Sequence, residues 1–153
     1  MSTKAKIEID DITELRDHLD IIYQTTTNGL LMRYGVNLAK HILKMVNIPL
    51  DKNIQNGFSL LENLQNGSAT IHELRQAGFN IHKLARQAPD AVLATAYRAI
   101  AHAIANGHMK EHVIVASDYA IKPINILEPN NEAAVKKERQ FQIALLEAAI
   151  NNY

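Results

Sequence analysis

Histidines gather in one short stretch of this chain. His102, His108 and His112 surround an Asn106-Gly107 pair. His108 and His112 have the i, i+4 spacing that lets two imidazoles on one helix face bind one metal ion, and such rings also act as general bases when a nucleophile lies within reach. The flanking residues are mostly alanine and branched apolar types, and a polar group on such a helix costs free energy unless it finds a partner. This stretch is therefore the first place to look for a site.

The surrounding motifs do not match a catalytic pattern. The segment His108-Met109-Lys110-Glu111-His112 places its glutamate fourth, whereas zinc proteases use His-Glu-x-x-His. Ser117 is the nearest hydroxyl, but it lacks the glycine-flanked turn of a hydrolase nucleophile, and the isolated glycines form no phosphate-binding loop. We therefore expect no enzyme activity, no cofactor and no metal. If a metal is bound, the expected ligands are His102, His108 and His112.

A polar stripe runs along the helix that precedes the Asn106-Gly107 pair. Thr95, Arg98, His102 and Asn106 follow one another at offsets of three and four residues, which places them on one side of a helix. Two interpretations remain open. The stripe is either the solvent edge of the helix, or a polar seam that lines an internal cleft or a partner surface.

The helix after the pair divides into faces in the same way. His112 and Tyr119 share one face, and a second, neighbouring polar face carries Glu111, Asp118 and Lys122. The opposite side is apolar and should point to the core. The remaining histidines are expected at the surface or at a helix edge: His18, His41, His72 and His82.

Helical periodicity accounts for nearly the whole chain. Predicted helices begin at about residue 11 and about residue 30, the second ending before Pro49, and continue over about 51–65, 70–85, 89–105, 109–121 and 131–151. This pattern predicts an all-α, single-domain helical bundle of about six or seven helices over residues 1–153. We expect residues 1–10 to be disordered or extended, and the hairpin closed by Asn106-Gly107 to lie at the centre.

Local signals set several helix boundaries. Asp11 with Glu14 and Thr70 with Glu73 resemble capping boxes, and Pro89 suits the first turn of a helix. Residues 124–128 lie between two prolines and are expected to be an extended connector. Residues 6–9 alternate like a short strand, but no second strand is available to pair with them.

Composition excludes several classes of protein. Of 153 residues, 16 are Lys or Arg and 16 are Asp or Glu, so no net basic charge favours nucleic acid or an anionic membrane. There is no cysteine, which excludes disulfides and thiolate chemistry. No apolar run resembles a signal peptide or a membrane span. We expect a cytoplasmic protein without a nucleic-acid or membrane partner.

The residues around the histidines resemble a family of immunity proteins linked to bacterial polymorphic toxin systems. The shared pattern comprises Arg98-Ala99, His102-Ala103, His108, His112 and the segment from Tyr119 to Lys122, and it continues in Glu138-Arg139-Gln140-Phe141-Gln142. The resemblance extends from about Leu30 to the C-terminus. Ala101 replaces a usual glycine, Asn106-Gly107 replaces a more helix-friendly pair, and Phe141 replaces a usual tryptophan.

The resemblance implies an all-helical cytoplasmic protein that protects its own cell by binding a cognate toxin. The motif residues would be Arg98, His102, His108, His112, Tyr119, Lys122, Glu138 and Arg139. They either contact the toxin or hold the central helices together while the toxin binds elsewhere. The alternatives are a small helical metal-binding protein or enzyme that uses the histidines, and a structural homo-oligomer.

Overall fold

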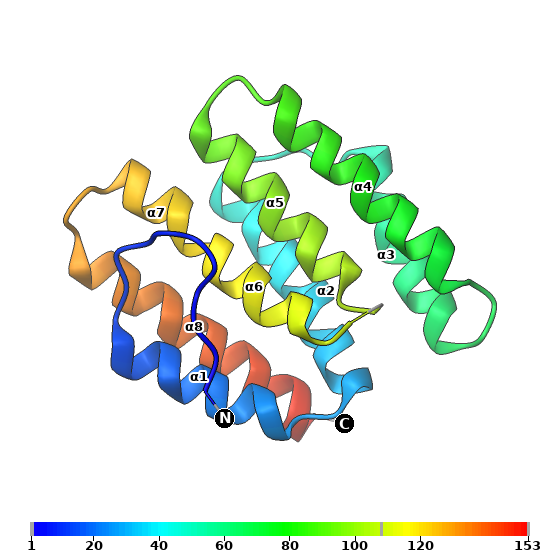
Figure 1. Cartoon of the computed structure of the whole chain (residues 1–153), viewed down its shortest axis with the longest axis horizontal. Coiled ribbons are helices and arrows are strands. Elements are labelled where there is room, and N and C mark those ends of the chain that lie inside the picture. Colours follow the sequence, from blue (N-terminus) through cyan, green and yellow to red (C-terminus); the bar gives the residue numbers. More distant parts are fainter. Residues whose placement is uncertain (1, 108, 153) are drawn as a thin grey trace.

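Helices joined by short turns make up the computed structural model, which describes residues 2–107 and 109–152 (Figure 1). These residues form eight helices: α1 (Thr13–Thr25), α2 (Asn28–Met45), α3 (Lys52–Gln65), α4 (Ile71–Gln87), α5 (Ala91–Ala105), α6 (Glu111–Tyr119), α7 (Ile121–Leu127) and α8 (Glu132–Asn151). The predicted all-α class is confirmed, and the described residues contain no strand. None of their helices is long and apolar enough to cross a membrane.

Side-chain caps explain where several helices begin. Thr70 and Glu73 form the predicted capping box of α4, and the side chains of Asp51, Asp90 and Asn131 accept backbone N–H bonds at the starts of α3, α5 and α8. The predicted capping box at Asp11 is wrong. The N-cap of α1 is Ile12, which has no side-chain cap, because the carboxylate of Asp11 is bound to Arg139.

Two proline predictions are also corrected. Pro89 lies outside α5, which begins at Ala91 after the Asp90 cap. The expected extended connector between the two later prolines is largely helical, since α7 runs from Ile121 to Leu127. Pro123 occupies the third position of α7, where a backbone N–H has no partner within the helix in any case. A proline near a helix start therefore does not stop the helix.

Helix α5 lies at the centre of the bundle and packs against α2, α4, α6 and α7 (Figure 1). Its small side chains let neighbouring backbones approach closely. A Cβ atom built on Gly35 of α2 would lie only 2.8 Å from the backbone oxygen of Ala103. The hairpin of α5 and α6 turns at Asn106 and Gly107, and both residues are buried. The predicted central position of this helix is correct.

Residues 2–12 form an extended segment, which we call the N-terminal strap. Figure 1 shows it in dark blue, crossing the face made by α6, α7 and α8. The backbone N–H of Thr3 donates to Asp20 at 2.8 Å, Lys122 Nζ donates to the backbone oxygen of Glu8 at 2.9 Å, and the backbone of Asp10 exchanges two hydrogen bonds with the Asn125 side chain. The strap pairs with helices and not with another strand.

Candidate functional site

Five side chains from three helices form what we call the histidine cluster: His82 of α4, Arg98 and His102 of α5, and His112 and Tyr119 of α6. His102 is central. Its ring stacks on those of His112 and Tyr119, each with a centroid distance of 5.2 Å, and meets His82 edge-on at 5.1 Å. The Nδ1 atoms of His102 and His112 are 3.0 Å apart. Since two acceptors cannot bond, one Nδ1 carries the proton and donates it to the other.

The protonation states of this cluster follow from burial and from Arg98. Arg98 Nη1 lies 3.0 Å from His82 Nδ1. A guanidinium can only donate, so His82 accepts there and carries its proton on Nε2. Burial, reinforced by the charge of Arg98, lowers the pKa of His82 to about 4. Burial and the neighbouring imidazoles lower the pKa of His102 to about 3. Both rings are therefore neutral at pH 7.

This arrangement is poorly suited to acid–base catalysis. An efficient general base has a pKa near the working pH, whereas His82 and His102 titrate well below it. Ser117, the nearest hydroxyl in sequence, is bonded elsewhere, to Tyr34 Oη and to the backbone oxygen of Val113. Within residues 2–107 and 109–152, no group of three or more candidate ligands is arranged to hold a metal ion. His108, the third predicted ligand, lies outside the described residues.

A second polar group lies in the interior, and we call it the buried ion network. Asp118 of α6 is at its centre. Arg16 donates two hydrogen bonds to its carboxylate, at 3.1 and 2.9 Å, and Arg139 donates a third at 2.7 Å. Arg139 also binds Asp11 of the strap through two hydrogen bonds. Burial alone would raise the pKa of Asp11, but the hydrogen bonds and charge of Arg139 outweigh it and lower that pKa.

The network continues along α8 toward α2. Gln142 accepts a hydrogen bond from Arg139 and donates to the backbone oxygen of Ser117. Glu138 lies 2.8 Å from His41 Nε2, and the His41 ring stacks on Phe141 with a centroid distance of 4.1 Å. These contacts connect α2, α6 and α8 with the strap, so the second group is a structural joint.

The motif residues therefore occupy three places and not one site. Arg98, His102, His112 and Tyr119 meet in the histidine cluster. Glu138 and Arg139 belong to the buried ion network and its extension. Lys122 holds the strap, and the placement of His108 lies outside the described residues.

Several participants were missed or misplaced by the sequence reasoning. Asp118 was expected on a polar face with Glu111 and Lys122, but it is buried between two arginines because its charge is compensated there. His82 and His41 are partly exposed, which agrees with the expected helix edge, but their partners Arg98 and Glu138 were not predicted. For Arg16 a signal was present in the sequence, since it lies four residues after Ile12 and three before Leu19 and thus on the apolar face of α1.

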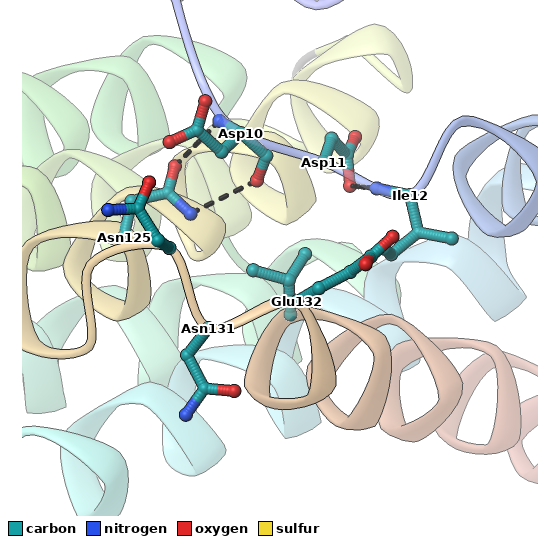
Figure 2. A pocket seen from close by; sticks show the side chains of 8 residues that line it. Asp10, Asp11, Ile12, Asn125, Asn131 and Glu132 are labelled. Atoms are coloured by element: carbon teal, nitrogen blue, oxygen red, sulfur yellow. Dashed lines mark hydrogen bonds between the residues drawn. The ribbon is translucent and has the colours of Figure 1, made fainter.

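A small pocket of about 260 Å³ lies where the strap meets the ends of α7 and α8. Figure 2 shows the Asn125 side chain turned toward the backbone of Asp10, and Asp11 beside Ile12. Asn131 caps α8, and Asp11 is held by Arg139. Because most of its polar groups have structural partners, this pocket is a seam between the strap and the bundle.

The sequence of most of the bundle matches a known protein family. Residues 22–149 match the sequence model of a family described as Imm-5 like putative immunity protein. No curated protein and no solved structure shows significant similarity to the chain. The matched residues include α2 to α7 entirely and nearly all of α8, whereas the strap and most of α1 precede them. This match confirms the resemblance noted in the sequence, and the chain belongs to the family of Imm-5 like putative immunity proteins.

Proposed function

We propose that this protein neutralises a cognate bacterial toxin by binding it, without catalysis, in the cytoplasm of the cell that makes it. The family match over residues 22–149 carries the proposal, because an immunity protein implies a toxin partner. A protein that acts in this way needs a complementary surface with a few well-packed anchors and no reactive centre.

The interior polar groups support a binding role. In the histidine cluster, Arg98 binds His82, and the Nδ1 atoms of His102 and His112 bind each other. In the buried ion network both arginines are matched by carboxylates. Polar groups that satisfy one another fix the helices in place and thereby hold the outer surface in one shape.

The test is co-expression with the toxic domain of the polymorphic toxin encoded beside this gene. We expect the chain to restore growth and to form a stoichiometric complex with the purified domain, measured by isothermal titration calorimetry. The toxin domain recovered from the complex should have an unchanged mass and regain full toxicity. A lack of both growth rescue and binding would refute the proposal. A toxin domain returned with an altered mass would show that the protein acts by catalysis.

A further inference from the structure

The outer face of α4 carries a row of cations interrupted by an aromatic ring. Arg75, Phe79, Lys83 and Arg86 follow at offsets of four, four and three residues, so they share one side of the helix. All four are exposed, and Phe79 is 55% exposed. The opposite side of α4 packs against α3 and α5. We call this row the α4 basic stripe.

The cations of the stripe take part in no ion pair among the described residues. In the part of the chain that the structure describes, no carboxylate lies within ion-pair distance of Arg75, Lys83 or Arg86. The acidic residues near the ends of α4 already have partners, since Glu73 bonds to Thr70 and Asp90 caps α5. Lys83 and Arg86, which are three residues apart on the helix, carry like charges and repel each other. Ion pairing within the described residues therefore does not account for these cations.

The two exposed phenylalanines, Phe79 and Phe141, differ in their aromatic contacts. Phe141 is 44% exposed, but its ring stacks on His41. Among the described residues Phe79 has no aromatic partner and no cation above its ring. Aromatic and arginine side chains are enriched at protein–protein interfaces and supply much of their binding energy. An exposed ring between cations is thus a suitable anchor for a partner protein.

We propose that the α4 basic stripe is the surface that binds the toxin, and that it faces an acidic surface of that toxin with Phe79 as the central apolar contact. This inference rests on the proposed function. A protein partner is favoured over nucleic acid because the chain as a whole has equal numbers of basic and acidic residues, whereas nucleic-acid-binding domains are strongly basic.

The experiment compares two charge reversals of equal size. Lys83→Glu/Arg86→Glu changes the stripe, and Lys136→Glu/Lys137→Glu changes two exposed lysines of α8. Binding to the toxin domain encoded beside this gene is measured by surface plasmon resonance at about 0.1 M and about 0.5 M NaCl, between which the screening length shortens about twofold. Circular dichroism checks that each variant remains folded.

We expect the stripe variant to bind at least about 30-fold more weakly at low salt, with much of the loss in the association rate. The α8 variant should stay within about threefold of wild type, because charges away from an interface have small effects on affinity. Wild-type association should slow at high salt, and association of the stripe variant should not. Phe79→Ala should speed dissociation without changing this salt dependence.

Three results would overturn the inference. If both reversals bind like wild type, the toxin binds elsewhere, and the proposed function survives. If the wild-type chain does not bind the toxin domain, the proposed function fails and this inference fails with it. If the wild type binds a single-stranded oligonucleotide of about 20 nucleotides at about 0.15 M NaCl and the stripe variant does not, the stripe is a polyanion site. If the charge reversals unfold α4, the variant Lys83→Gln/Arg86→Gln replaces them in the comparison. We then expect the affinity for the toxin domain to fall about tenfold.

Discussion

Burial keeps His82 and His102 neutral, and Arg98 reinforces this at His82, because a guanidinium donates hydrogen bonds and cannot accept them. His82 is held as a neutral acceptor by this contact, and its pKa of about 4 lies below the ordinary value of 6.5. His102, at the centre of the cluster, has a pKa of about 3. At pH values between these lowered pKa values and the ordinary pKa of 6.5, the unfolded chain binds protons at the two histidines that the folded chain does not bind. The cluster therefore makes the protein less stable as the pH falls through that window.

Replacing His82 by glutamine tests this linkage. His82→Gln keeps an acceptor oxygen for Arg98 but removes the titrating group. We expect the free energy of unfolding to fall less steeply in the variant than in wild type between pH 6.5 and pH 4. One histidine contributes at most about 1.4 kcal/mol per pH unit, and solvent screening at this partly exposed site reduces that value. Urea unfolding at several pH values measures the slope.

The matched control is His18→Gln, at an exposed position of α1, which should leave the slope unchanged. Identical slopes for His82→Gln and wild type would contradict the expected role of His82.

Asp118 is the second residue with a large expected effect. Its carboxylate accepts hydrogen bonds from two buried arginines, so Asp118→Asn leaves part of their positive charge without compensation. We expect a loss of about 3–5 kcal/mol in the free energy of unfolding, measured by urea denaturation at pH 7. Asp17→Asn, at an exposed position of α1, should change stability by less than about 0.5 kcal/mol. A loss of similar size in both variants would argue against the network.

At the scale of the elements, helix starts with side-chain caps could be predicted from the sequence. The Thr70 capping box of α4 is confirmed because its partners are close in sequence. Predictions failed where a distant residue competes for the same group. Asp11 reads locally as a cap, but Arg139 of α8 binds it. The continuation of helix through α7 was also missed, since proline was taken as a stop although the first turn of a helix tolerates it.

The contact between α2 and α5 gives a prediction at this scale. A Cβ atom at Gly35 would press against the backbone oxygen of Ala103, whereas one at Gly78 would meet Ala105 Cβ at an ordinary 3.7 Å. We expect Gly35→Ala to lower the free energy of unfolding by about 1–3 kcal/mol through overpacking. Gly78→Ala should raise it by about 0.5–1 kcal/mol, because alanine favours the helix. Urea denaturation measures both, and equal effects would disprove the close approach.

For the whole molecule, the sequence indicated an all-helical bundle but not how its polar residues are grouped. Helical spacing placed Arg98 and His102 on one stripe, and the structure adds His82 from α4. That addition depends on how α4 packs on α5, which periodicity within one helix cannot reveal. The two partners of Asp118 likewise lie 102 and 21 residues away along the chain. Buried charges paired over such distances are a property of the assembled bundle.

The α4 basic stripe has an evolutionary consequence. Its charged side chains lack carboxylate partners within the described chain, and the buried side of α4 packs against α3 and α5. Substitutions at such surface positions change stability by about 0.5 kcal/mol or less. New side chains can therefore arise on this face while the bundle stays intact. If the stripe binds the cognate toxin as proposed, the chain can follow changes in that toxin by substituting a few exposed residues of α4, while the helical bundle is retained.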